Sequence, residues 1–425
     1  MTSKQKKILL IIITIGFVYF IIFFFPNNTG AKDERMLGSL SHDETITYPY
    51  VLKMLTPSQN IHELWGKLII YGDYHYGYPF YFISMLVVLP VKLIFGAQFQ
   101  SHTQLNLLLL RQFVSVLPMI VAIGFLTFIM TRFKHWFRSI GLFVFLLSIP
   151  AVVRQNLVWW HPDALTLLAG VLTLFFLDLD QLKFRRYFYL AAFTCGLAAA
   201  IKLLGFFFIL TIPAYLVIGL LTHRLTLRRA VVSGALFVFI MTATIILTNP
   251  FLFYQTQRQQ LINIQNEKSV ELSKGYTHDS AYYYQKGPFW WKWTLETWYA
   301  PVPFLLFLAA SNIAGCFWGS KKFTNRLLIS WMVPYSFYLL YFVAPKPDHY
   351  WLPVMLPLFA CTFNFIDIFS PDDQLSLAKN RNKMILRWGI IAVVVLIVGL
   401  QFKQNLSSDY ANYIDNLFQE LRLRH

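Results

Sequence analysis

The sequence predicts an all-α membrane protein that crosses the bilayer many times. Only 13% of its 425 residues are charged, about half the share of an average soluble protein, and 57% are hydrophobic. The mean hydropathy is +0.52. The apolar residues also form blocks of the length that a helix needs to cross a bilayer. Together these observations predict a bundle of transmembrane helices.

The formal net charge of +16 points to the membrane and not to nucleic acid. Lys and Arg accumulate in the cytoplasmic loops of membrane proteins, so the excess needs no nucleic-acid partner. A smaller share of the charge is available to an anionic lipid headgroup or lipid phosphate. The three cysteines all lie in apolar runs and give neither a disulfide framework nor a metal-binding spacing.

The amino terminus has the pattern of an uncleaved signal anchor. Lys4, Lys6 and Lys7 precede an apolar run over residues 8–25, which is too long for an ordinary signal peptide and has no small-residue cleavage site after it. We therefore expect residues 1–25 to form the first span, in the inner or plasma membrane, with a cytoplasmic amino terminus. Residues 26–112 then form a long extracytoplasmic loop with interfacial helices.

Loop charge predicts the remaining spans, because basic clusters mark the cytoplasmic ends. If all basic clusters are cytoplasmic, the spans between them must come in pairs. This gives about eleven spans and an external carboxyl terminus. The predicted spans cover residues 8–25, 113–130, 140–153, 164–179, 187–200, 203–221, 231–248, 302–318, 327–343, 351–365 and 385–402.

Residues 79–95 are apolar but are not counted among these spans. The run is short and is interrupted by Pro90. Only one crossing fits between the anchor and the basic cluster at Arg132, and residues 113–130 suit it better. We expect residues 79–95 to lie at the interface or to re-enter on the outer side, as the floor of a site.

The whole chain is predicted to be one integral membrane domain with its function at the outer face. Its parts are a helix bundle (113–248), a second long external loop (249–301), the carboxyl-terminal spans (302–402) and an external tail (403–425). The cytoplasmic links are short and basic and leave no room for a domain. The long polar loops are all external, so functional side chains should gather there.

Asp43 and Glu44 are adjacent carboxylates a short way beyond the first span. A partly desolvated Asp or Glu on an external loop can serve as a general base. Two plainer interpretations stay open, a solvated acidic loop or a cap of the helix that follows.

Two further regions carry charge at the outer ends of spans. Arg154, His161 and Asp163 join two spans, where Asp163 also suits a helix start. Lys202 lies between two apolar runs, where a charge is costly and marks a functional site unless it snorkels to the interface. A phosphate is the ligand that its compact ammonium suits best.

Lys346, Asp348 and His349 form a short charged turn before an aromatic pair, and contact with an anion or a sugar is the functional interpretation. In the long external loop, residues 276–284 and 289–293 are dense in Tyr and Trp. Aromatic faces hold sugar rings, but aromatic residues are equally typical of a membrane interface.

Taken together, these features resemble the GT-C superfamily of membrane glycosyltransferases, close to the protein O-mannosyltransferases and the aminoarabinose transferases of lipid A. The resemblance covers nearly the whole chain as an order of spans and loops. The residues that carry it are Asp43 and Glu44, the aromatic segment 76–81 with Tyr78, Arg111 before the next span, Arg154, His161 and Asp163, the segment 196–202 that ends in Lys202, and the turn 346–353.

The resemblance implies a GT-C-like fold and an inverting transfer from a polyprenyl-phosphate sugar to an acceptor hydroxyl on a glycan, lipid or protein of the cell envelope. Asp43 corresponds to the catalytic base of that family, and basic residues meet the donor phosphate. Glu44, Tyr78, Arg111, Asp163, Asp348 and His349 complete the implied substrate-binding set. Some members use a divalent cation, although no spacing here demands one.

The chain departs from the family in two ways, and other classes compete. The aromatic segment has one proline where relatives often have two, and no large soluble domain follows the last span. A transporter or a flippase for lipid-linked sugars would also explain Lys202 and the aromatic residues, but not the long acidic first loop. A non-catalytic assembly factor of the same architecture is the third alternative.

Overall fold

The computed structural model describes residues 1–32, 42–275, 284–368 and 381–422, and the regular structure within these ranges is entirely helical. The helices of the first half are α1 (Ser3–Ile22), α2 (Phe24–Thr29), α4 (His42–Leu55), α5 (Ile61–Ile69), α6 (Tyr78–Phe95), η1 (Gly96–Ser101), α7 (Thr103–Leu110), η2 (Arg111–Val116), α8 (Leu117–Thr131), α9 (Trp136–Leu147), α10 (Pro150–Asn156), α11 (Asp163–Asp180) and α12 (Arg186–Ile201). Those of the second half are η3 (Leu203–Leu210), α13 (Thr211–Leu221), α14 (Leu227–Thr248), η4 (Pro250–Phe253), α15 (Gln255–Lys274), α16 (Pro288–Trp298), α17 (Val302–Phe317), α18 (Lys322–Phe342), η6 (Asp348–Trp351), α19 (Leu352–Ala360), η7 (Cys361–Phe363), α20 (Asn364–Ile368) and α22 (Arg381–Arg422).

The described residues contain seven helices that are long and apolar enough to cross a membrane, or up to nine if each of two bent pairs counts as one span. The protein is therefore a multi-pass α-helical membrane protein, but the predicted count of eleven is not reached. Three of the predicted spans, residues 164–179, 187–200 and 327–343, do form helices, namely α11, α12 and α18, but fall outside this set. With Asp163, Asp178 and Asp180, α11 carries too many charges to count as a candidate membrane span, and α12, with 16 residues, is too short to count as one.

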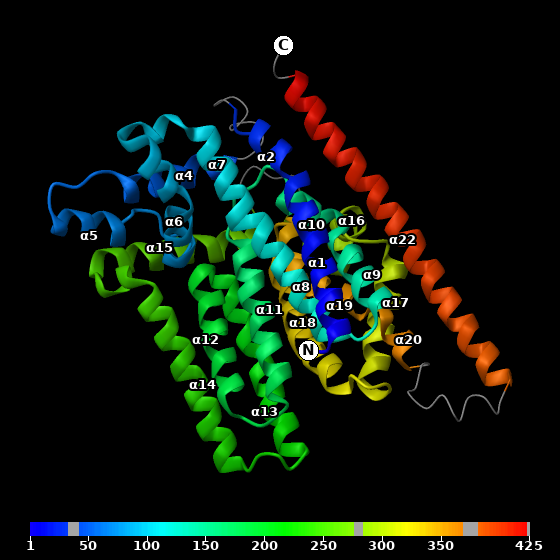
Figure 1. Cartoon of the computed structure of the whole chain (residues 1–425). Coiled ribbons are helices and arrows are strands. Elements are labelled where there is room, and N and C mark those ends of the chain that lie inside the picture. The colour runs from blue at the N-terminus through cyan, green and yellow to red at the C-terminus, as the bar shows by residue number, and fades with distance from the viewer. Residues whose placement is uncertain (33–41, 276–283, 369–380, 423–425) are drawn as a thin grey trace.

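The segment 79–95 forms α6, which η1 extends to Ser101. Tyr78–Ser101 is long and apolar enough to cross a bilayer, although it was not counted among the predicted spans. Its proposed place at the outer interface stays a prediction. In Figure 1 it lies with α4 and α5 at one end of the bundle of long helices.

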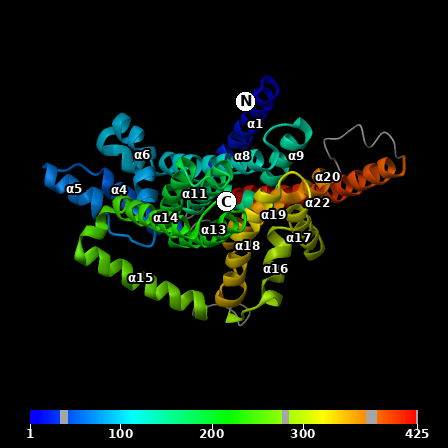
Figure 2. The same ribbon diagram turned by 90° about the horizontal axis from the view of Figure 1, so that it is seen from below.

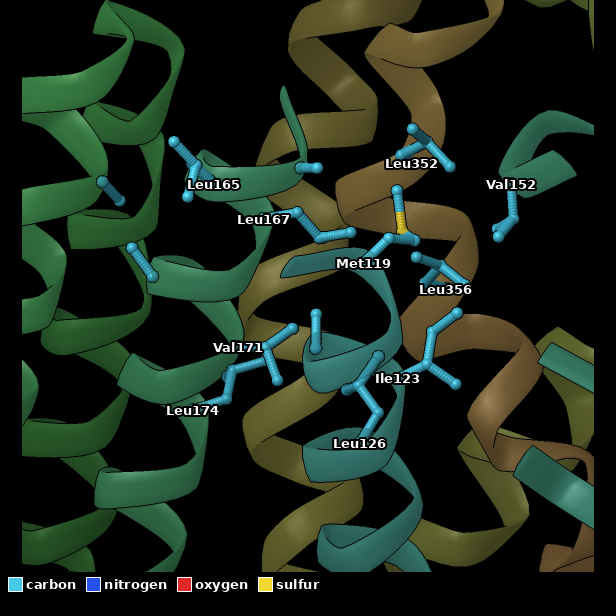
Figure 3. Packing of buried hydrophobic residues seen from close by; sticks show 14 of the residues in the cluster. Met119, Ile123, Leu126, Val152, Leu165, Leu167, Val171, Leu174, Leu352 and Leu356 are labelled. Atoms are coloured by element: carbon cyan, nitrogen blue, oxygen red, sulfur yellow. The ribbon is translucent and has the colours of Figure 1, made fainter. Parts of the chain in front are cut away.

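The core of the bundle is built by α8, α11 and α19, which pack directly on one another. Figure 3 shows the apolar side chains of these helices interdigitating, with Met119, Ile123 and Leu126 on α8, Leu167, Val171 and Leu174 on α11, and Leu352 and Leu356 on α19. Small residues then allow α12 to approach α14 closely. A Cβ added to Gly196 would lie 2.7 Å from the Met241 carbonyl oxygen, so only glycine fits there.

The basic loops gather at one end of the molecule. The Gln5 side chain donates to the Arg132 carbonyl at 2.8 Å, and Arg132 forms an ion pair with the buried Asp178. Asp178 also accepts from Thr324 at 2.7 Å, next to the basic residues Lys321 and Lys322. Clusters that the sequence predicts to share one side of the membrane are therefore neighbours in space. Which side of the bilayer this end faces stays a prediction.

The opposite end carries the short helices and the long polar helix α15. Figures 1 and 2 show α15 lying across this end, from the neighbourhood of α5 toward α16 and α18. The Ala344 N–H donates to the Leu272 carbonyl at 2.8 Å and fixes the far end of α15. All the predicted site residues described below belong to segments at this end.

Candidate functional site

Asp43 lies in the first turn of α4 with an exposed side chain. Its backbone carbonyl accepts from the Thr47 hydroxyl at 2.9 Å. Its carboxylate makes no hydrogen bond or ion pair with any residue that the structure describes. A carboxylate without a protein partner is free to meet a substrate.

Glu44, the next residue, is fully buried and forms an ion pair with Arg111, which is also fully buried. The Arg111 Nε donates to Glu44 Oε1 at 2.9 Å, and the Trp160 N–H donates to the same oxygen at 2.6 Å. Arg111 also donates to the carbonyls of Asn27 and Gly30 at 2.8 and 3.2 Å. Four separate segments thus meet at one buried pair: α4, η2, residues 27–30 and the residues around Trp160.

This geometry gives Glu44 and Arg111 a different role from the substrate contact that the resemblance implies. Their charged atoms are occupied by each other and by backbone groups, and neither residue reaches the surface. Arg111 begins the π-helical segment η2, a rare conformation that is frequent at functional sites. Here the pair fixes the position of Asp43 on one side and of Trp160 on the other.

Asp163 is the centre of a second cluster, drawn from three of the segments that the sequence singled out. The Lys202 ammonium donates to Asp163 Oδ1 at 2.6 Å, and the His161 Nδ1 lies 2.6 Å from Oδ2. The His349 Nε2 lies 3.8 Å from Oδ2. Asp163 therefore gathers one ammonium and two imidazoles at one buried point. The structure brings these residues together, while their place at the outer face and their contact with a substrate stay predictions.

His161 connects the two clusters. Its Nε2 lies 2.7 Å from the Tyr76 hydroxyl, and its ring stacks on Trp159 with centroids 4.6 Å apart. Its neighbour along the chain, Trp160, binds Glu44. Residues 160–163 therefore link the buried Glu44–Arg111 pair, which lies beside Asp43 in the chain, to the Asp163 cluster.

Arg154 and Asp348 pair with each other at the rim of this cluster, with Arg154 Nε 3.4 Å from Asp348 Oδ2. The Arg154 guanidinium also stacks on Trp298 at 4.5 Å, and its side chain remains 52% exposed. The backbone carbonyl of Asp348 accepts from the Tyr299 hydroxyl at 2.7 Å. The free edge of Arg154 is available to an anion, whereas Asp348 is largely buried.

Lys346 is buried, although the sequence had offered it as a substrate contact. Its ammonium donates to the carbonyls of Gln285, at 2.7 Å, and of Ala344, and lies 4.9 Å from the centroid of the Trp291 ring. Burial lowers the pKa of Lys346 to about 8. The residue joins three segments of the outer end and is not open to a ligand in this conformation.

Tyr78 begins α6, and the backbone before it is docked tightly on the end of α12. The Gly77 N–H donates to the Ile201 carbonyl at 2.9 Å, and the Tyr78 N–H donates to Asn249 Oδ1 at 2.8 Å. A Cβ on Gly77 would lie 1.5 Å from the Ala200 carbonyl oxygen. Lys202, which binds Asp163, is the residue after Ile201. The close approach of Gly77 to α12 therefore sets the distance between the first loop and the Asp163 cluster.

An Asp–His pair on the same loop was not among the sequence-predicted site residues. Asp73 is buried and accepts from the His75 N–H at 3.0 Å and from the Tyr81 hydroxyl, and His75 Nδ1 lies 2.6 Å from the same carboxylate. Burial raises the pKa of Asp73, but these hydrogen bonds outweigh it and hold the pKa below its ordinary value. The contact with Asp73 raises the pKa of His75. The spacing of an Asp two residues before a His is the only sequence signal for this pair.

The aromatic loop is described only in part, since residues 276–283 lie outside the described ranges. Of the segment 289–293, Trp291 is buried and donates to the Leu339 carbonyl at 3.0 Å. Phe289 and Trp293 are exposed and suit either a sugar ring or the membrane interface. Within the described ranges, no group of three or more His, Cys, Asp or Glu residues could hold a metal ion.

This end of the molecule therefore offers a carboxylate open at the surface, a cluster of basic side chains around one buried acid, and exposed aromatic rings. This set can accept a proton and stabilise an anion within one region. No known protein-family model and no curated protein sequence matches this chain.

Proposed function

We propose that this protein is a GT-C-type glycosyltransferase that moves a sugar from a polyprenyl-phosphate donor to an acceptor hydroxyl at the outer face of the membrane. One observation carries the proposal. Asp43 presents an exposed carboxylate that has no partner among the described residues, while its neighbour Glu44 forms a buried pair with Arg111. Two adjacent acids thus have separate roles, one open to chemistry and one structural.

In the proposed reaction, Asp43 takes the proton of an acceptor hydroxyl as that oxygen attacks the anomeric carbon of the donor. The new C–O bond forms as the bond between the anomeric carbon and the phosphate oxygen breaks, so the configuration inverts. The proton ends on Asp43, and the bonding pair leaves with the lipid phosphate. A positioned general base of this kind contributes about 10²- to 10⁴-fold in rate.

The leaving phosphate needs positive charge, and the Asp163 cluster and Arg154 are its proposed source. Lys202, His161 and His349 surround Asp163, and Arg154 keeps an exposed edge nearby. Cations held in place before the reaction stabilise developing charge without reorganisation. Glu44 and Arg111 act in this scheme by holding Asp43 and Trp160 in position.

The test compares the envelope glycans and glycolipids of cells that lack the protein with those of cells supplied with wild type, Asp43→Asn or Glu63→Gln, using mass spectrometry. Glu63 is the matched control, because it is a partly exposed acid of the same loop whose carboxylate contacts Lys67 and the Gln59 backbone N–H. We expect a product that wild type and Glu63→Gln restore and Asp43→Asn does not. Full restoration by Asp43→Asn would overturn Asp43 as the general base, and identical glycans and glycolipids with and without the protein would overturn the transferase.

A further inference from the structure

His75 presents an oriented imidazole at the outer end, and the proposed reaction does not use it. Asp73, with 3% of its side chain exposed, fixes the ring through Nδ1, while 45% of the His75 side chain is exposed. When Nδ1–H points at Asp73, a neutral ring presents Nε2 as an acceptor. The Tyr81 hydroxyl holds Asp73 from behind, so the carboxylate serves mainly to orient this histidine.

Helix α15 lies close to the loop that carries His75, and it has an unusually polar composition for so apolar a chain. Seven of its twenty residues are Asn or Gln. The rings of Tyr74 and Phe251, with centroids 4.7 Å apart, join the His75 loop to η4, from which α15 continues. Lys268 and Glu271 of α15 are close enough to influence the charge of His75.

One side of α15 is directed toward the body of the protein. Gln257, Leu261, Ile264, Gln265 and Lys268 are partly buried, whereas the residues between them are largely exposed. Gln257 and Gln265 are eight residues apart, a spacing that places both on the same side of an α-helix. No described residue of α15 is fully buried, so amide groups on this side face the body without tight packing.

Most of the charges that the structure describes around His75 have partners of opposite sign. Asp73 pairs with His75, and Lys268 lies 2.8 Å from Glu271. Lys53 of α4 also lies at this loop, where it donates to the Ile70 and Tyr71 carbonyls at 3.3 Å and has no acid partner among the described residues. The described surroundings therefore carry little net charge and are rich in hydrogen-bond donors and acceptors. Such a surface suits a ligand with many hydroxyl groups and no charge.

We infer that His75 and the body-facing side of α15 form the acceptor subsite, and that the acceptor bound there is a neutral glycan of more than one sugar residue. This inference rests on the proposed transferase function and names the class of its acceptor. His75 accepts a hydrogen bond from a sugar hydroxyl through Nε2, and Asp73 acts as a positioning residue. Gln257 and Gln265, about 12 Å apart along α15, bind hydroxyl groups of separate sugar residues.

The test measures product in cells that carry His75→Gln or the pair Gln257→Leu and Gln265→Leu. The matched controls are His62→Gln, an exposed histidine of α5, and the pair Gln260→Leu and Asn266→Leu on the outward side of α15. Detergent-solubilised protein is checked by size exclusion, so that misfolded variants are recognised. We expect a loss of product of about tenfold or more in the first set and wild-type amounts in the controls.

Two further readouts separate binding from structure. In membranes given glycans extracted from cells that lack the protein, His75→Gln should raise the acceptor concentration for half-maximal rate and leave that of the donor unchanged. Asp73→Asn should shift the acid side of the pH profile toward lower pH, because the imidazole loses the carboxylate that favours its protonated form. A structural role alone would produce neither change.

The outcomes distinguish this inference from the proposed function. Loss of product in Asp43→Asn with full product in His75→Gln and in the glutamine pair would overturn the subsite and keep the transferase. Loss in the His75 and glutamine variants with full product in Asp43→Asn would keep the subsite and overturn the base. Fragment masses showing that the sugar was added to a phosphorylated, carboxylated or protein acceptor would overturn the neutral-glycan assignment.

Discussion

The backbone N–H of Trp160 donates to Glu44 Oε1 at 2.6 Å. This bond joins the helix that carries Asp43 to the loop with His161 that leads into Asp163 at the start of α11. Trp160 and Glu44 are 116 positions apart in the chain. Arg111 completes the arrangement from a third segment. The end of the protein that carries these residues is therefore organised around a buried ion pair, and the segments that hold Asp43, His161 and Asp163 are attached to that pair.

Breaking this pair should destabilise the fold. Glu44→Gln or Arg111→Met alone leaves one buried charge without its partner, which costs about 3–5 kcal/mol. The double replacement should cost less than the sum of the two, because no isolated charge remains. Thermal unfolding of the purified protein in detergent measures all three variants. Single variants as stable as wild type would show that the pair is not formed.

Asp43→Asn should separate activity from stability. The side chain is exposed and without a described partner, so the free energy of unfolding should change by no more than about 0.5 kcal/mol. Sugar transfer should fall by about 10²- to 10⁴-fold, as expected for loss of a general base. Transfer rates in membranes and thermal unfolding of the same preparation check both statements. A large loss of stability would mean that Asp43 is structural.

The Asp73–His75 pair should give stability a defined pH dependence. Asp73 has a lowered pKa, so its contribution is present above its ordinary value of 3.8 and is lost as pH falls through the folded value. His75 has a raised pKa, so the contribution of its charge is present below 6.5 and is lost as pH rises through the folded value.

The measurement is the difference in thermal midpoint between wild type and Asp73→Asn across this pH range. The difference should be largest between the two ordinary pKa values and should shrink on either side. A difference for Asp73→Asn that does not vary with pH would contradict the pair.

Gly77→Ala should prevent the first loop from docking on α12. Its Cβ would lie 1.5 Å from the Ala200 carbonyl oxygen, a backbone atom that cannot turn aside. We expect a loss of at least about 3 kcal/mol, the upper range for overpacking. Gly66→Ala is the matched control, because nothing lies within 4 Å of its added Cβ and alanine favours the helix α5. Equal expression and melting of the two variants would refute the close approach.

The sequence located the helices better than it counted the membrane crossings. Each predicted span coincides with a helix or a bent pair of helices, because hydropathy is a local property of the chain. The count failed at α11, α12 and α18. Acids lower the apolar signal of α11, α12 is short, and α18 is 21 residues long but carries Lys322, Asn325, Arg326 and Pro334. Asp178 and Asp180 lower the signal in α11, yet they serve to bind Arg132 and the backbone of Phe184 and Arg185.

Among the candidate site residues, too, the sequence marked some correctly and others not. The cost of placing Lys202 among apolar runs marked it from the sequence alone, and its pairing with Asp163 agrees with that reasoning. Lys346 and Asp348 were marked by charge as well, yet the structure buries both. His75 was passed over, because nothing in its immediate sequence shows that the buried Asp73 orients its ring.

By itself, the sequence determined that this protein is a multi-pass helical membrane protein, where its helices lie and which charged residues are unusual. Composition and hydropathy suffice for this, because each helix satisfies its own backbone hydrogen bonds. Only the tertiary structure decided which of those residues are paired. Glu44 and Arg111, 67 positions apart, are partners because several helix ends meet there. A buried charge is stable only with a partner. Packing therefore buries Glu44 against Arg111 and leaves its neighbour Asp43 exposed at the surface.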